Sequence, residues 1–169
     1  MRFNILGILS AVALLAACET VPVEDTTSSG GGETVASSSE AVASSLAAPY
    51  PGSQEDLVVN VGDRVFFDYD RFDLNEESRS TLEKQAAWLA KYPAVSIRIE
   101  GHCDERGTRE YNLGLGERRA NAAKDYLVAL GVAPDRITSV SYGEERPVAM
   151  GSNDAAWAQN RRAVTMVGG

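Results

Sequence analysis

The sequence predicts an α+β domain built on a mixed four-stranded sheet, with its helices packed on one face. From about Val58 onwards, segments typical of strands alternate with segments of helical periodicity, in the order β-α-β-α-β-(α)-β. Helices between consecutive strands favour parallel neighbours joined by right-handed crossovers. The chain of 169 residues contains no internal repeat, so one domain with appendages accounts for its length.

The first strand and the first helix are predicted between residues 58 and 93. The segment VVNVGDRVFF, residues 58–67, is β-branched and aromatic, which predicts a strand interrupted near Gly62. Asn75 is a good helix N-cap, and two glutamates follow it in the first turn. Pro93 marks the end of this helix. Its apolar side chains recur at helical spacing: Leu82, Ala86 and Leu89.

The remaining elements follow from the same two periodicities. Residues 95–101 alternate between apolar and polar and predict a half-buried strand. A long helix is predicted from Leu113 to Leu130, with Gly131 just past its end. Residues 138–142 and 161–167 predict two further strands, separated by a short helix over 154–159. The long helix is expected to bury Ala123, Tyr126, Leu127 and Leu130.

The first third of the chain predicts an export signal followed by a flexible tether. Residues 1–17 combine a basic start with an apolar run too short to span a bilayer comfortably, as in a signal peptide. Leu15-Ala16-Ala17-Cys18 resembles the bacterial lipobox, so Cys18 is expected to carry lipid; the alternative is a plain secretory signal with a chance cysteine. Residues 18–56 are rich in Ser, Gly and acid and predict a tether. The folded domain is expected over residues 57–169.

Charge and cysteine content narrow the function further. The formal net charge is −8, and residues 18–56 hold seven acids and no base, so the predicted domain is close to neutral. A nucleic-acid partner is not expected, because phosphate binding needs clustered Lys and Arg. If Cys18 carries lipid, Cys103 is left alone and cannot form an intramolecular disulfide.

The stretch GHCDERGTREYNLGLGERRA, residues 101–120, concentrates the ionisable groups of the chain. A metal site is disfavoured, since His102 is the only histidine and consecutive residues of a strand point to opposite faces. Catalysis is also disfavoured, because no nucleophile elbow precedes a helix and Cys103 beside His102 is more typical of a small buried residue. No cofactor is expected. Two hypotheses remain equal on spacing alone, a solvated charged face and a binding socket beyond the end of a strand.

The same stretch closely resembles the signature of the OmpA-like peptidoglycan-binding domain, roughly G-H-x-D-x-x-G-x-x-x-Y-N-x-x-L-(S/G)-x-x-R-A. The resemblance continues in VFFDYDRFDLNEESRSTL, SYGEERPV and NRRAV, and covers about residues 65–167. With the lipobox and the tether in front, the whole chain is similar to the lipoproteins of the Tol–Pal system that carry this domain. Cys103 and Gly114 depart from the residues common in the family.

The resemblance implies non-covalent binding to the peptide stem of peptidoglycan through its meso-diaminopimelate residue. The free end of that residue is a zwitterion, which calls for one acid and one guanidinium close together. Asp104 and Arg119 occupy the family positions for these two roles, and Arg118 is expected to form ion pairs on the helix surface instead. The surrounding wall is implied at Phe67, Asp68, Asn112, Leu115 and Arg162.

The expected function is therefore structural, and the chain is not expected to be an enzyme. The resemblance implies an outer-membrane lipoprotein with its domain in the periplasm, where Glu19 after the cysteine, rather than Asp, favours transport to the outer membrane. It also implies a partner, the periplasmic β-propeller of the Tol system, and a role in cell division. The alternatives are a cell-wall hydrolase accessory and a stator-type protein, each using a similar wall-binding domain.

Overall fold

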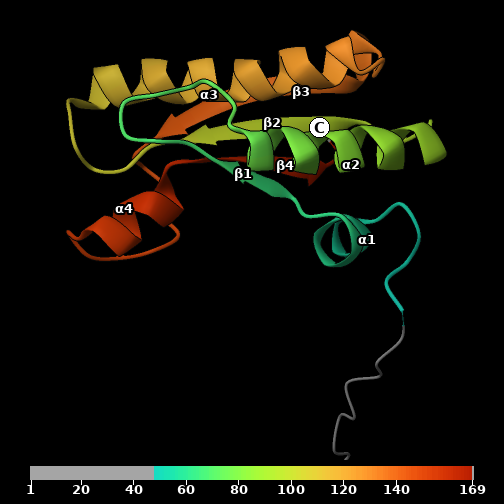
Figure 1. Cartoon of the computed structure of the whole chain (residues 1–169), viewed down its shortest axis with the longest axis horizontal. Coiled ribbons are helices and arrows are strands. Elements are labelled where there is room, and N and C mark those ends of the chain that lie inside the picture. The colour runs from blue at the N-terminus through green and yellow to red at the C-terminus, as the bar shows by residue number, and fades with distance from the viewer. Residues whose placement is uncertain (1–47, 169) are drawn as a thin grey trace, which may run out of the picture. The chain divides into compact units, whose positions relative to one another are not determined.

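The computed structural model describes residues 48–168, which form a four-stranded sheet covered by helices (Figure 1). The strands are β1 (Arg64–Phe66), β2 (Ile97–His102), β3 (Ile137–Gly143) and β4 (Arg162–Val167). Their spatial order is β1-β4-β2-β3, with β2 and β3 parallel and both β4 pairings antiparallel. The predicted mixed four-stranded sheet is confirmed.

The two long helices, α2 (Glu76–Lys91) and α3 (Arg109–Ala129), cover one face of this sheet, as predicted (Figure 1). The side chain of Asn75 caps α2 by accepting a hydrogen bond from the Ser78 amide at 2.8 Å. The core between helices and sheet is aliphatic, which supplies most of the stability of such a layer. Its fully buried members include Leu82, Leu89, Ile97, Ile99, Ala120, Ala123, Leu127, Ile137 and Ala163.

The short helix α1 (Gln54–Asn60) packs beside α2, and the short helix α4 (Asp154–Asn160) lies near the ends of β2 and β3 (Figure 1). A single 3-10 turn, Pro134–Arg136, leads into β3. Helix α4 was predicted almost to the residue. Helix α1 was not, because residues 58–60 were expected to be a strand and residues up to 56 a tether.

Helix α1 forms because its capping groups outweigh the β-branched residues that suggested a strand. Ser53 accepts a hydrogen bond from the Asp56 amide, and Glu55 and Asp56 lie in the first turn. The Asp56 carboxylate also accepts hydrogen bonds from Asn60 and, across to α2, from Trp88. Leu57 is fully buried in the core, so the folded domain begins before residue 57.

Helix α3 begins four residues before the predicted Leu113, because Thr108 caps it by accepting a hydrogen bond from the Tyr111 amide. Its far end is close to the prediction, with Gly131 at a φ of 97° just beyond. Ala123 and Leu127 are buried as expected, but Leu130 is exposed.

A glycine contact between β2 and α3 determines where the two elements meet. A Cβ atom on Gly101 would lie 1.8 Å from the carbonyl oxygen of Gly116. Only glycine at position 101 therefore allows α3 to lie this close to β2. The close approach brings the middle of α3, with Arg119, beside the loop that follows β2.

The predicted signal peptide (residues 1–17), Cys18 and most of the predicted tether lie outside the described residues. Within residues 48–168, none of the helices has the length and hydrophobicity needed to cross a membrane.

Candidate functional site

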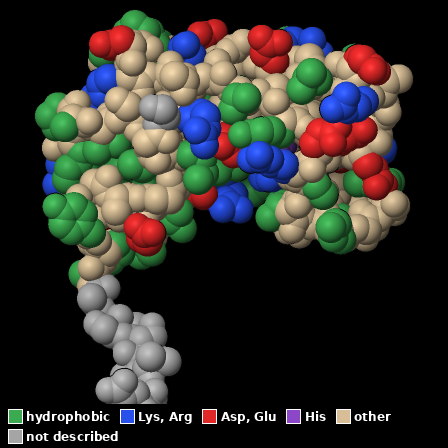
Figure 2. All heavy atoms as spheres, turned by 180° about the vertical axis from the view of Figure 1, so that it is seen from behind, with side chains coloured by type: hydrophobic (Ala, Val, Ile, Leu, Met, Phe, Trp, Pro, Cys, Tyr) green, Lys and Arg blue, Asp and Glu red, His purple; other side chains and the backbone are tan. Residues whose placement is uncertain are grey.

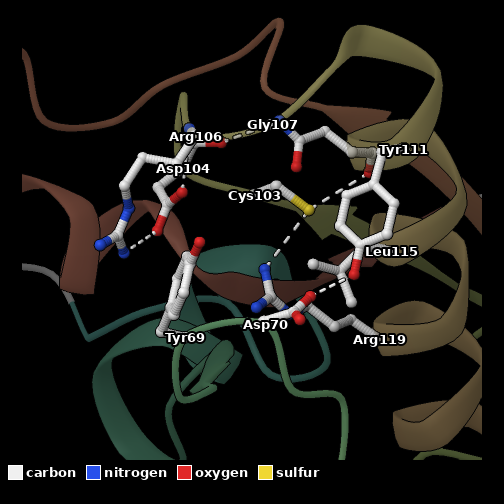
Figure 3. Close-up of a pocket in the computed structure, with 10 residues that line it drawn as sticks. Tyr69, Asp70, Cys103, Asp104, Arg106, Gly107, Tyr111, Leu115 and Arg119 are labelled. Atoms are coloured by element: carbon white, nitrogen blue, oxygen red, sulfur yellow. Dashed lines mark hydrogen bonds and ion pairs between the residues drawn. The ribbon is translucent and has the colours of Figure 1, made fainter.

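A small cavity lies beyond the carboxyl end of β2, between the β2–α3 loop, the first turns of α3 and the loop after β1 (Figure 3). Its volume is about 90 Å³, below the usual range for small-molecule sites. Such a volume suits the headgroup of a ligand rather than a whole polymer. We call it the charged cavity; its lining residues are Tyr69, Asp70, Cys103, Asp104, Arg106, Gly107, Tyr111, Asn112, Leu115 and Arg119.

Asp104 is the buried acid of the charged cavity and is only 4% exposed. Its Oδ1 accepts a hydrogen bond from the Arg106 amide at 3.1 Å, and its Oδ2 accepts from Arg106 Nη2 at 2.6 Å and Arg161 Nη1 at 3.2 Å. Burial opposes ionisation, but these hydrogen bonds outweigh it and lower the pKa of Asp104 below its usual value. The acid is therefore ionised at neutral pH.

Arg119 is the buried base of the charged cavity, and its residue is fully shielded from solvent. Nε donates to the carbonyl of Arg71 at 2.8 Å, Nη1 to that of His102 at 2.9 Å, and Nη2 to that of Asp68 at 3.1 Å. Nη1 also lies 3.4 Å from the Cys103 sulfur (Figure 3). Four of the five N–H bonds of the guanidinium are thus used, and one on Nη2 remains.

The charge of Arg119 is not balanced by an ion pair. Among residues 48–168, no Asp or Glu forms a salt bridge with it. Burial lowers the pKa of Arg119 from its ordinary value, although the guanidinium stays protonated. A buried cation without a counter-ion at the wall of a cavity favours an anionic ligand.

The predicted wall residues divide into three groups. Asn112 and Leu115 line the charged cavity. Phe67 does not line it, but the Arg119 guanidinium lies 5.3 Å from the centre of its ring. Asp68 contributes its backbone carbonyl to Arg119, while its residue borders a different hollow beside α4.

Arg162, which the resemblance implied in the wall, does not line the charged cavity. It donates instead to the carbonyls of Asn160 and Arg146. The neighbouring Arg161 is not a lining residue either, but it forms an ion pair with Asp104.

Several residues of the cavity were not predicted as parts of a site. Asp70 is one, and it has a φ of 56°, the only positive φ of a non-glycine residue in the described part of the chain. Its carboxylate accepts a hydrogen bond from the Tyr111 hydroxyl. Strained backbone of this kind concentrates at functional sites. The sequence signal was weak, because an Asp in a polar loop is also typical of ordinary turns.

The solvated-face hypothesis holds for some of the charged residues and fails for others. Arg109 pairs with Glu145 on the surface, and both are largely exposed. Figure 2 likewise shows acidic and basic side chains intermixed over one face of the molecule. Asp104 and Arg119, in contrast, are buried. Arg118 forms no ion pair with any residue from 48 to 168, contrary to expectation, and lies near the rings of Phe72 and Tyr111.

The two residues considered for catalysis are both buried. Burial raises the pKa of the Cys103 thiol to about 11, so little reactive thiolate forms at neutral pH. His102 stacks on Tyr142, and its ring nitrogens have no hydrogen-bond partner among the described residues. The described residues contain no group of three metal-ligating side chains.

The sequence matches the OmpA family over residues 66–161, more than half of the chain, and the chain belongs to that family. It is 59% identical over 119 residues to the peptidoglycan-associated lipoprotein of Rhizobium meliloti (strain 1021), an alignment that covers 70% of this chain and 68% of the relative. It is 47% identical over 100 residues to the protein of the same name from Haemophilus influenzae, covering 59% of this chain and 65% of that one.

Solved structures agree with this assignment. The peptidoglycan-associated lipoprotein from Burkholderia pseudomallei superposes with a TM-score of 0.61 at 42% identity, covering 63% of this chain and 90% of that chain. The C-terminal domain of Helicobacter pylori MotB superposes with a TM-score of 0.59 at 23% identity, covering 63% of this chain and 84% of that chain. At that identity, the second likeness concerns the fold alone.

Proposed function

We propose that this protein is a structural lipoprotein that binds peptidoglycan non-covalently through the charged cavity and so tethers the envelope to the cell wall. The observation that carries the proposal is the pair of buried, oppositely charged side chains in one small cavity, Asp104 and Arg119. The relatives at 55–59% identity that are named peptidoglycan-associated lipoproteins support it. The role is one of binding rather than catalysis.

We infer that the ligand group is the free end of meso-diaminopimelate in the peptide stem. That group carries an ammonium and a carboxylate on one carbon. The remaining N–H of Arg119 and its unbalanced charge suit the carboxylate, and Asp104 suits the ammonium. Asn112 strengthens the arrangement by donating from its side chain to the carbonyl of Asp104 at 3.2 Å, which fixes the loop.

Titration of soluble stem peptides into the full-length chain tests this function. A stem with lysine in place of diaminopimelate lacks the carboxylate, so Arg119 would be buried without a counter-ion in that complex. We expect the diaminopimelate stem to bind at least ~10-fold more tightly, because a site built for a polar group rejects the analogue that lacks it. Equal affinity for the two stems would rule out the zwitterion site.

Membrane attachment is the second half of the proposal and depends on Cys18. We propose lipidation of Cys18, location in the outer membrane, and partnership with the periplasmic β-propeller of the Tol system during division. Cys18→Ala should release the folded domain from the membrane fraction, because one residue then removes the whole anchor. A mutant chain that stays with the outer membrane after a high-salt wash would contradict lipid anchoring. Pull-down of sacculi with and without the propeller would show whether the two partners compete.

A further inference from the structure

Arg106 is held in the charged cavity by contacts from three segments of the chain. Its guanidinium lies 4.0 Å from the ring centre of Tyr69 and 4.1 Å from that of Trp157, so it is sandwiched between two aromatic rings. Trp157, from α4, donates in turn to Glu105 at 3.1 Å. The Arg106 Nε atom is buried without a hydrogen-bond partner, a cost that the arrangement tolerates. The guanidinium is therefore fixed rather than free in solvent.

The fixed guanidinium contacts the acid expected to receive the ammonium of the ligand. Arg106 Nη2 lies 2.6 Å from Asp104 Oδ2, and Arg161 Nη1 lies 3.2 Å from the same oxygen (Figure 3 shows the first pair). Asp104 thus has two cationic partners, whereas Arg119 has no anionic partner in the part of the chain that the structure describes. The two halves of the charged cavity are electrostatically unequal.

We propose that Arg106 is a built-in counter-ion of Asp104 that sets the charge preference of the cavity, making the ligand's carboxylate a stronger determinant of binding than its ammonium. This inference rests on the proposed function. Arg106 acts through Asp104: it neutralises the acid and leaves only part of Oδ1 for a ligand donor. Asp70, the other acid of the cavity, is exposed and therefore screened by water.

The test uses three stem peptides that differ only at the free end of one side chain. The first carries diaminopimelate, with both charges; the second carries lysine, with the ammonium alone; the third carries 2-aminopimelate, with the carboxylate alone. For the full-length wild-type chain, loss of the carboxylate should weaken binding more than loss of the ammonium. In Arg106→Met, which keeps an unbranched side chain that can contact the two rings but carries no charge, the penalty for losing the ammonium should grow at least ~10-fold.

Three further variants isolate the mechanism. Arg109→Met removes an exposed arginine of the same segment that pairs with Glu145, and should leave both penalties unchanged. Arg106→Lys restores the charge and should return the ammonium penalty towards that of the wild type. Asp104→Asn combined with Arg106→Met should abolish the increase, because the acid freed in the single variant is then gone.

The outcomes separate this inference from the proposed function. Suppose that the loss of affinity on removing the ammonium is the same in wild type and Arg106→Met, or that a folded Arg106→Met binds no stem. Either result overturns the role proposed for Arg106 and leaves the proposed function standing. Failure of the wild type to bind any stem overturns the proposed function. In that case, NMR titration of the Asp104 carboxyl group in the ligand-free chain still decides: its pKa should rise in Arg106→Met and stay unchanged in Arg109→Met. A pKa that is equal in all three chains refutes the inference.

Discussion

Beside each end of the sheet lies an arginine that donates to three backbone carbonyls. Comparing the two shows which features of such an arginine stabilise the fold and which suit it to bind a ligand. At the far end, Arg136 donates to Leu89, Tyr92 and Val95, joining the end of α2 to the start of β2. At the cavity end, Arg119 joins the loop after β1 to the end of β2. The bonding is similar, but the surroundings of the charge differ.

Arg136 has its charge compensated within the fold. Two of its acceptors, Leu89 and Tyr92, lie at the carboxyl end of α2, where the helix dipole is negative, and its residue is half-buried, so water also screens it. Arg119 is fully buried, and its acceptors belong to a loop and a strand end. At the cavity end, no ion pair within residues 48–168 compensates Arg119, whereas at the far end the helix dipole and water compensate Arg136. An arginine of this kind becomes part of a binding site when the fold satisfies its hydrogen bonds but not its charge.

The largest expected effect concerns this pair of arginines. Arg119→Ala leaves three backbone carbonyls without a donor, that of His102 in a buried position, and should lower the free energy of unfolding by about 3–5 kcal/mol, whereas Arg136→Ala should cost about 1–3 kcal/mol. Only the Arg119 substitution should also weaken stem binding. Urea unfolding combined with stem titration measures both quantities on the full-length chain.

If the alanine variants do not fold, the milder variants Arg119→Lys and Arg136→Lys can be compared in their place. A lysine preserves the charge but not the planar fork, so Arg119→Lys should still bind the diaminopimelate stem more weakly than Arg136→Lys does. Equal binding by the two lysine variants would show that the cavity end is no more specialised than the far end.

The second prediction concerns acid stability and compares His102 at the cavity end with Asp56 at the far end. Burial, assisted by the nearby Arg162 and Arg146, lowers the pKa of His102 to about 3; Glu100 is 4.0 Å away, too far for a hydrogen bond that would oppose this shift. The unfolded chain binds a proton at this histidine below about pH 6.5, and the folded chain does not. Stability is thus complete above pH 6.5 and falls with decreasing pH, by at most ~1.4 kcal/mol per unit.

Asp56 behaves differently, since hydrogen bonds from the Gly52 amide, Trp88 and Asn60 lower its pKa to about 2. Its contribution is present above the ordinary Asp value of 3.8 and is lost only as the pH falls from there towards 2. His102→Phe replaces a ring whose nitrogens have no partners, and should remove the fall between pH 6.5 and about 4.5. Urea unfolding of both chains between pH 6.5 and about 4.5 measures this change in the free energy of unfolding. If the free energy falls equally steeply in wild type and His102→Phe, other groups cause the acid sensitivity.

The parts of the fold and of the charged cavity that could be predicted from the sequence are those set by a local sequence pattern. The parts set by a tertiary contact could not be predicted. Asp104, Arg119, Asn112 and Leu115 were predicted because one contiguous motif spans the β2–α3 loop and the start of α3. The sandwich around Arg106 was not, because Trp157 is brought from α4 by the packing of the whole domain. One larger error was local, because the Ser53 cap outweighed the β-branched valines of α1. Arg162 was implied by the resemblance alone, and it lies outside the charged cavity.

The third prediction is smaller and concerns the sulfur between the two halves of the charged cavity. Cys103→Ala removes a buried sulfur that contacts Arg119 and the Asn112 carbonyl, and should cost about 1 kcal/mol of stability. Stem binding should change little, because the donors of Arg119 to backbone carbonyls remain. Peptide mapping after thiol labelling should find Cys103 protected in the native chain and reactive in urea. Loss of binding with the fold intact would give the thiol a direct role.

The smallest expected effect distinguishes two glycines in the first half of α3. A Cβ atom at Gly114 would meet only Arg118 Nη1, at 3.6 Å, whereas one at Gly116 would lie 2.3 Å from Ser141 Oγ and 3.0 Å from the Gly101 carbonyl oxygen. Gly114→Ala should therefore stabilise the chain by about 0.5–1 kcal/mol through helix propensity and lower unfolded-state entropy. Gly116→Ala should destabilise it, because Ser141 and the β2 backbone must give way.

Gly114 also tests whether the cavity end needs a loosely held helix in order to bind. Its residue lies on the turn of α3 between Asn112 and Leu115, but it does not line the charged cavity. If Arg119 and Asp104 are already fixed by their own hydrogen bonds, a firmer helix leaves them in place. We therefore expect Gly114→Ala to raise the urea midpoint while stem affinity stays within about twofold, since no ligand contact changes. A stabilised variant that binds markedly more weakly would mean that binding requires movement at the start of α3.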